Sequence, residues 1–232
     1  MSWHERTGRG VRVAVIDSGI HASHPHVGGI AGGAAFGDEG DPTADTTDRI
    51  GHGTAVAAAI REKAPDAELY AIKIFERTLA TTTDRLVRAI AWAADAGAQV
   101  INLSLGTPRQ EHEPRLRAAV AYAAKRGAVI VAAEESDGIR WLPGSLPGVI
   151  PVRLDWECPR DGFRILESPS GSRFLASGFA RPIPGVPLEA NLKGISFAVA
   201  NVSGFAARAF EETPGASVGD VCGLLRDNPS FS

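Results

Sequence analysis

Residues 11–16 read VRVAVI, and an aspartate, Asp17, follows them directly. Valine and isoleucine dominate this run, which is typical of a strand buried in a parallel sheet. The runs at residues 69–74, 99–103, 128–133 and 149–154 have the same character, and apolar residues at helical spacing separate several of them, at residues 83–96 and 115–126. Strands that alternate with helices predict a three-layer α/β fold, with a mostly parallel central sheet and helices on both faces.

The remaining segments are consistent with one domain over residues 1–232. Residues 28–48 are rich in Gly, Asp and Thr and predict a surface loop. Residues 160–177 predict an antiparallel hairpin or a loop-rich excursion, and residues 196–210 and 218–226 predict closing helices. No repeat or linker divides the chain, so we expect a single domain.

The composition excludes several classes of partner. The formal net charge is −3 and the pI is near 6.1, so no basic field suggests nucleic acid or a membrane surface as a partner. No apolar run approaches the roughly 20 residues that cross a bilayer. Residues 1–10 lack a hydrophobic signal core, and Cys158 and Cys222 do not make a disulfide framework. These features predict a cytoplasmic protein, and they carry no signal for its oligomeric state.

Three polar residues stand where an element is expected to begin or end. Asp17 follows the carboxyl end of the first strand, and open α/β sheets bind ligands beyond these strand ends. An aspartate at this position can instead cap a turn. His52, within GHGTAVA at residues 51–57, precedes an apolar helix expected at residues 55–61, and it is either a catalytic base or a structural histidine near the start of that helix. Ser196 begins the helix in GISFAVANVSG, at residues 194–204, as a nucleophile or as a small residue that allows close packing.

The combination of these residues favours catalysis. A neutral imidazole accepts a proton from a hydroxyl when a carboxylate fixes its tautomer. Backbone N–H groups at the start of a helix favour the negative charge that then develops. The order Asp17, His52, Ser196 therefore predicts nucleophilic catalysis by the serine.

On these residues the chain resembles the subtilisin-like serine peptidases, the subtilases, from residue 11 to residue 226. VAVIDSGI at residues 13–20, with Ser23-His24-Pro25, resembles the aspartate motif of that family, GHGTAVA the histidine motif and GISFAVANVSG the serine motif. INLSLGTP, at residues 101–108, resembles the strand that binds an extended substrate backbone. The order of the three catalytic residues is also that of subtilisin.

The resemblance implies roles for individual residues. Ser196 would be the nucleophile, His52 the base and Asp17 the residue that orients the imidazole. The backbone of Ser104, Leu105 and Gly106 would pair with a peptide or protein substrate and help to form the pocket for the P1 side chain. No cofactor is implied.

The chain departs from the family near the expected oxyanion hole. Ser136 stands where the family has an asparagine, so we expect a shorter hydrogen-bond donor and a weaker hole. Glu135 stands where a glycine of the P1 pocket is usual, beside Glu134. These carboxylates could select Arg or Lys at P1, turn to solvent, or oppose the developing oxyanion.

The calcium loop of relatives is also missing, since residues 61–68, REKAPDAE, connect the histidine helix directly to the next strand. Two other groups suggest metals less directly. One is the acidic set Asp38, Glu39, Asp41 and Asp45, and the other is the histidine set His21, His24 and His26. We expect no metal site at either.

The sequence therefore predicts a serine endopeptidase with the triad Asp17, His52 and Ser196, acting in limited processing of a peptide or protein. The alternative is a pseudoprotease that binds a peptide or partner in the same cleft but turns over poorly. Residues 134–136 discriminate between them, because an impaired oxyanion hole argues against catalysis.

Overall fold

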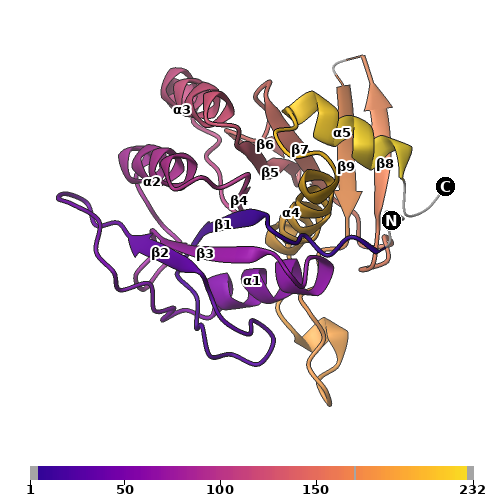
Figure 1. Cartoon of the computed structure of the whole chain (residues 1–232), viewed down its shortest axis with the longest axis horizontal. Coiled ribbons are helices and arrows are strands. Elements are labelled where there is room, and N and C mark those ends of the chain that lie inside the picture. The colour runs from indigo at the N-terminus through magenta and orange to yellow at the C-terminus, as the bar shows by residue number, and fades with distance from the viewer. Residues whose placement is uncertain (1–4, 170, 229–232) are drawn as a thin grey trace.

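A continuous β-sheet runs through the middle of the computed structural model, which describes residues 5–169 and 171–228 (Figure 1). Its order is β2-β3-β1-β4-β5-β7-β9-β8, with β6 paired to the end of β5. Only the β8–β9 and β5–β6 pairs are antiparallel, so the predicted, mostly parallel sheet is confirmed. The strands are β1 Arg12–Asp17, β2 Gly32–Ala35, β3 Glu68–Lys73, β4 Val100–Leu103, β5 Val129–Ser136, β6 Ile139–Arg140, β7 Val149–Leu154, β8 Phe163–Ser168 and β9 Gly171–Ala176.

Helices cover both faces of this sheet (Figure 1). They are α1 His52–Lys63, α2 Thr83–Asp95, α3 Glu113–Lys125, α4 Ile195–Glu212 and α5 Val218–Asp227. α2 and α3 pack on one face, and α1, α4 and α5 lie over the other. Within the described residues, no helix combines the length and the apolar character that crossing a membrane requires.

The alternation of side chains along β1 divides the interior into two cores. Val13 and Val15 belong to the core beneath α1 and α4, whereas Ala14 and Ile16 belong to the core beneath α2 and α3. Both sets are fully buried, because successive strand residues point to opposite faces and both faces are covered. The unbroken apolar run in the sequence follows from this two-sided burial.

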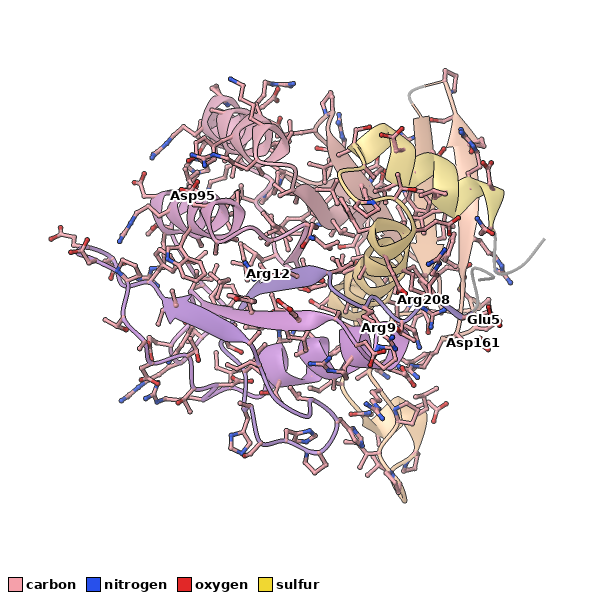
Figure 2. All side chains as sticks on the ribbon, in the orientation of Figure 1. Glu5, Arg9, Arg12, Asp95, Asp161 and Arg208 are labelled. Atoms are coloured by element: carbon pink, nitrogen blue, oxygen red, sulfur yellow. The ribbon has the colours of Figure 1, made fainter. Side chains whose placement is uncertain are left out.

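α4 is the central helix of its layer and is buried along most of its length. Small residues let it approach α1, and a Cβ at Gly204 would lie 2.5 Å from the Cβ of Lys63. The far end of α4 holds the chain near its N-terminus, since the Glu211 carboxylate accepts hydrogen bonds from the backbone N–H groups of Thr7, Gly8 and Arg9. Figure 2 shows Arg9 and Arg208 at this end of the molecule.

Two strands lie in segments that the sequence pattern predicts differently. β2 lies within residues 28–48, where we expected only a loop, and pairs in parallel with β3 at the edge of the sheet. Its four residues, GGAA, lack the β-branched side chains typical of strands. The close approach of β2 to β3 requires glycine, because a Cβ at Gly33 would lie 2.1 Å from the Ala71 carbonyl oxygen. β6 forms a two-residue pairing after a turn at Asp137-Gly138, both with positive φ. The hairpin expected at residues 160–177 is present as β8 and β9.

Candidate active site

Asp17 and His52 form a hydrogen-bonded pair at the carboxyl end of β1. Asp17 is the last residue of that strand and is 1% exposed. The His52 Nδ1 atom lies 2.8 Å from Asp17 Oδ1 and 3.0 Å from Oδ2. Since an ionised carboxylate only accepts hydrogen bonds, Nδ1 carries the proton and the neutral ring keeps Nε2 as its acceptor.

Glycines on both sides of His52 make this approach possible. Gly51 precedes α1 with a φ of 90°, a conformation that favours glycine. A Cβ at Gly53 would lie 2.2 Å from the carbonyl oxygen of Gly19, so any larger residue would push α1 away from β1. Burial lowers the pKa of His52, but the hydrogen bond and charge of Asp17, together with the charge of Asp48, outweigh it and raise the pKa above its usual value.

Asp48 fixes the first turn of α1 from the other side, and the sequence pattern did not single it out. Its carboxylate accepts hydrogen bonds from the Ile50, Gly51 and Thr54 N–H groups, and from the Thr54 and Ser18 hydroxyls. Ser18 Oγ in turn accepts the Gly53 N–H at 2.9 Å. This network satisfies N–H groups that the start of a helix leaves without partners, and it sets the position of His52.

Ser196 is the second residue of α4. The helix begins after Gly194, which has a φ of 148° and therefore favours glycine. The Ser196 hydroxyl donates to the Ser104 carbonyl at 3.3 Å, and the Ser104 hydroxyl donates to the Ser196 carbonyl at the same distance. These reciprocal bonds hold the nucleophile candidate against the segment that follows β4.

A second residue that the sequence pattern did not reveal, Asn102, supports this contact from below. It is fully buried in β4, and its amide donates to Ser104 Oγ at 2.9 Å. Its carbonyl oxygen accepts the Ser203 hydroxyl of α4 at 3.0 Å. An asparagine inside a buried apolar strand is itself a signal, because a buried amide needs partners.

His52 and Ser196 line one cleft of about 330 Å³ at the carboxyl ends of β1, β4 and β5. Ser104, Leu105 and Gly106 form one wall, and backbone pairing resumes at Thr107, which exchanges two hydrogen bonds with Leu142 at 2.9 Å. The other lining residues are mostly apolar: Phe75, Leu79, Ala133, Ser136, Trp141 and Ile195. Among the described residues that line this cleft, His52 alone has an ionisable side chain.

Ser136, the last residue of β5, lines the cleft. Its Oγ accepts a hydrogen bond from the Trp141 indole N–H at 3.1 Å. Because an indole N–H only donates, the serine oxygen acts as acceptor in this contact and its own proton is available to another acceptor. Trp141 therefore orients Ser136 as a donor.

Glu135 does not line the cleft, which differs from its expected place in the substrate site and from the acidic P1 pocket, one of the three alternatives for these carboxylates. Its carboxylate accepts from Arg153 Nη2 at 2.9 Å. Glu134 is buried and accepts from Arg153 Nε at 2.7 Å and from Arg173 Nε at 2.9 Å. A change in register between Ala133 and Glu135 lets both carboxylates meet arginines of β7 and β9, so their charges are neutralised there.

The acidic set and the histidine set, considered above as metal ligands, have other surroundings in the structure. Asp45 pairs with Arg49 at 2.7 Å, and Asp38 pairs with Arg85. His21, His24 and His26 line a separate cavity beside α1. Across residues 5–169 and 171–228, no three His, Cys, Asp or Glu side chains are grouped to hold a metal ion.

Comparison with known proteins agrees with this geometry. The Subtilase family model matches residues 8–136. Over 222 residues, the chain is 34% identical both to an alkaline protease of Alkalihalobacillus alcalophilus and to Subtilisin Savinase of Lederbergia lenta. Each alignment covers 90% of this chain, but 56% of the alkaline protease and 79% of Savinase. The chain thus spans little more than half the length of the first of these relatives.

A solved structure supports the same fold assignment. A cold adapted subtilisin-like serine proteinase superposes with a TM-score of 0.74 at 25% sequence identity, covering 96% of this chain and 83% of that one. The similarity therefore extends over nearly the whole chain.

Proposed function

Because the chain belongs to the subtilase family, we propose that it is a serine endopeptidase whose catalytic triad is Asp17, His52 and Ser196. The observation that carries the proposal is the buried Asp17–His52 hydrogen bond in a cleft that also contains the Ser196 hydroxyl. An aspartate-oriented imidazole beside a serine at a helix N-terminus is suited to acyl transfer.

In the proposed reaction, the Ser196 hydroxyl turns from the Ser104 carbonyl to His52 Nε2 and attacks the carbonyl carbon of the scissile bond. His52 accepts the hydroxyl proton, and Asp17 stabilises the resulting imidazolium. The imidazolium then gives the proton to the leaving amine, which departs and leaves an acyl group on Ser196. Water, deprotonated by the same imidazole, releases the acyl group and restores the serine.

Two donors are available to the oxyanion of the tetrahedral intermediate. One is the backbone N–H of Ser196 in the first turn of α4, and the other is the Ser136 hydroxyl that Trp141 orients. The positive charges of Arg153 and Arg173 offset the carboxylate charges of Glu134 and Glu135, which would otherwise oppose the oxyanion. These features favour an active peptidase over a pseudoprotease.

The apolar cleft favours an uncharged side chain at P1. Leu105, Trp141 and Ala133 surround the space beside Ser196, without a carboxylate to pair with a cation. Burial of an arginine or lysine there would cost free energy that no partner offsets, whereas an apolar side chain gains by leaving water. We therefore propose Leu or Phe at P1 in place of the Arg or Lys considered from the sequence.

We further propose that the enzyme processes a limited set of substrates in a reducing compartment such as the cytoplasm. A small cleft bounded by Trp141 supports selectivity, and the free thiols of Cys158 and Cys222 are compatible with reducing conditions. Fractionation of the source cells, followed by immunodetection, tests the location. Mass spectrometry of cleaved proteins in a lysate tests the number of substrates.

Labelling with a fluorophosphonate tests the proposed function, because the reagent needs an activated serine and no particular peptide. The intact mass should rise by one adduct in the wild type and in the matched control Ser172→Ala, a serine of the β8–β9 hairpin. Ser196→Ala should gain none. A folded wild type that gains no adduct would contradict the peptidase assignment and favour a pseudoprotease.

A further inference from the structure

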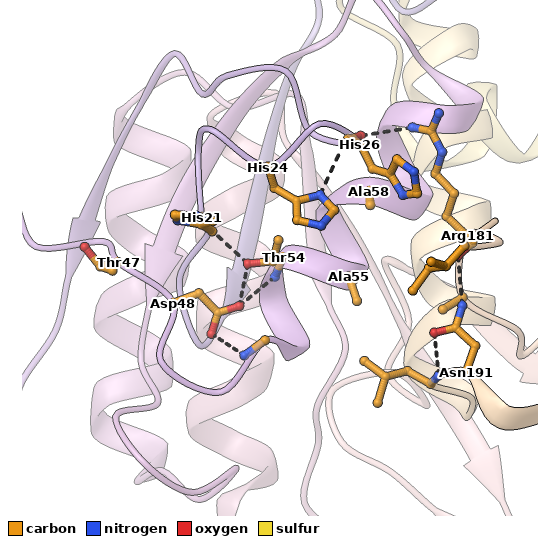
Figure 3. A pocket seen from close by; sticks show the side chains of 14 residues that line it. His21, His24, His26, Thr47, Asp48, Thr54, Ala55, Ala58, Arg181 and Asn191 are labelled. Carbon is orange, nitrogen blue, oxygen red and sulfur yellow. Dashed lines mark hydrogen bonds between the residues drawn. The ribbon is translucent and has the colours of Figure 1, made fainter. Parts of the chain in front are cut away.

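A second cavity, of about 490 Å³, lies beside the catalytic cleft and shares no lining residue with it. It is bounded by residues 21–26, residues 47–51, the start of α1 and residues 180–192, and we call it the histidine cavity. Figure 3 shows His21 and His24 near one side of it and Asn191 on the other, with His26 and Arg181 side by side and joined by a hydrogen bond. Its volume lies within the range of about 300–1,000 Å³ that is usual for ligand sites.

The histidine cavity lies next to the proposed triad on the side away from β4. α1 contributes His52 to the cleft and Thr54, Ala55 and Ala58 to the histidine cavity. Similarly, the start of α4 contributes Ser196 to the cleft, and Leu192, just before that helix, lines the histidine cavity. The two cavities are therefore neighbours, since α1 and the chain around residues 191–196 contribute lining residues to both.

The polar groups around the histidine cavity are mainly hydrogen-bond donors. Arg181 supplies a permanent positive charge and is anchored by a 3.0 Å bond from Nη1 to the His26 carbonyl. His24 Nδ1 accepts the His26 backbone N–H at 3.2 Å, so the neutral His24 ring carries its proton on Nε2. Burial, Arg181 and His24 lower the pKa of His26, and its neutral ring still keeps one N–H to donate.

The one carboxylate in this lining is already satisfied. Asp48 accepts five hydrogen bonds from the start of α1 and from Ser18, as described above. A ligand in the histidine cavity therefore meets a guanidinium and imidazole N–H groups without an acidic side chain that needs a partner. Charge-assisted hydrogen bonds from such donors favour a carboxylate.

The direction of the proposed reaction decides which part of a substrate reaches this cavity. The acyl half lies along residues 104–106, on the β4 side of Ser196. The leaving amine receives its proton from His52 and departs on the other side, toward the start of α1. On the basis of the proposed function, we infer that the histidine cavity binds an Asp or Glu side chain located C-terminal to the scissile bond, so that this peptidase prefers substrates with an acidic leaving segment.

Matched peptides test this inference. Internally quenched peptides with Leu before the scissile bond should carry Asp, Asn or Lys in turn at each of the first three positions after it. At one of these positions kcat/KM for Asp should exceed that for Asn about tenfold, the effect of one charge-assisted hydrogen bond, and Lys should be the poorest. Equal kcat/KM values for Asp and Asn at all three positions would overturn the inference.

Two variants assign the preference to Arg181. Arg181→Glu should reverse the order, so that the Lys peptide becomes better than the Asp peptide. Arg126→Gln, a matched control at the solvent-exposed end of α3, should keep the wild-type ratio of Asp to Asn. A ratio that Arg181→Glu leaves unchanged would contradict recognition in the histidine cavity.

Binding without turnover separates this inference from the proposed function. Fluorescence anisotropy with the Ser196→Ala variant should show the same preference for the Asp peptide over the Asn peptide. If the wild type neither labels nor cleaves but this preference is present, the peptidase assignment fails and the acidic site stands. If the wild type cleaves but neither assay shows a preference, the acidic site fails and the peptidase assignment stands.

Discussion

A single carboxylate, Asp48, influences both the position and the pKa of the proposed catalytic base. It accepts four hydrogen bonds from residues 50–54 at the start of α1 and a fifth from the Ser18 hydroxyl, and its charge contributes to the raised pKa of His52. His52 must be neutral to accept the Ser196 proton, so activity rises as pH passes above its pKa. Because that pKa is raised from 6.5, the acidic limb of the kcat/KM profile should lie above pH 6.5.

Asp48→Asn should move this limb to lower pH. The substitution removes a negative charge that stabilises the imidazolium, so the pKa of His52 falls and the neutral base forms at lower pH. The variant should also lose about 1–2 kcal/mol of stability, since an amide cannot replace all of the bonds that the carboxylate accepts. A pH profile of kcat/KM provides the measurement, with the exposed Asp41→Asn as control. An unchanged limb would restrict Asp48 to a structural role.

Ser136 and Trp141 can be tested as a pair through kcat. Ser136→Ala removes one proposed oxyanion donor and should lower kcat about 10²-fold while changing KM little. Trp141→Phe keeps most of the ring volume but releases the serine hydroxyl from its 3.1 Å bond, so kcat should fall less, by about 3- to 10-fold. In the double variant the effect of Trp141→Phe should disappear, because its target is gone. Fully additive losses would contradict the orientation of Ser136 by Trp141.

The site residues differ in how far the sequence predicts them. Asp17, His52 and Ser196 stand at the ends of recognisable apolar elements, so both their positions and their order carry information. Asp48 lies in a loop without a repeating pattern, and its role depends on hydrogen bonds to residues 2 to 30 positions away. The orientation of Glu135 depends on a register change in β5 and on Arg153 of the neighbouring strand, neither of which a local pattern reveals.

At the scale of elements, burial decides what the sequence predicts. β1, β3, β4, β5 and β7 each contain a mainly apolar run with buried residues on both faces, and the predicted runs agree with the structure to within a few residues. β2 and β6 have no comparable run of apolar residues. β2 forms because it pairs with β3, and β6 forms because a two-residue turn brings it back alongside β5. Tertiary pairing and turn geometry therefore explain these differences.

An ion-pair network joins three elements near the C-terminal end of α1. Glu62 accepts from Arg160 at 2.6 and 3.1 Å and from Lys63 at 2.8 Å, while Arg160 Nε donates to the Phe179 carbonyl. Phe179 lies in the segment between β9 and α4, the helix that carries Ser196. Burial raises the pKa of Glu62, but the bonds from Arg160 and Lys63 outweigh it and lower the pKa to about 2. The network therefore stabilises the fold while Glu62 is ionised.

Glu62→Gln should reduce the free energy of unfolding by about 1–2 kcal/mol at pH 7. The folded pKa lies below the ordinary value of 4.5, so this stabilisation is present above pH 4.5 and is lost as pH falls toward 2. Urea denaturation at pH 7, 4 and 3 should thus show a difference between wild type and variant that shrinks with acid. The exposed Glu39→Gln serves as control. A difference that stays constant with pH would rule out ionisation of Glu62 as its source.

At the scale of the whole molecule, two cores share one sheet, and we predict that they unfold together. Phe205 of α4 is 2% exposed and its ring lies 5.1 Å from the Phe163 ring in one core, whereas Ile90 of α2 is fully buried in the other. Phe205→Ala and Ile90→Ala should each cost about 3–4 kcal/mol. In a domain of this size each should lower Tm by about 6–15 °C.

Because β1 contributes side chains to both cores, calorimetry should show one transition that either substitution moves as a whole. Two transitions, each responding to only one substitution, would contradict a single domain over residues 1–232.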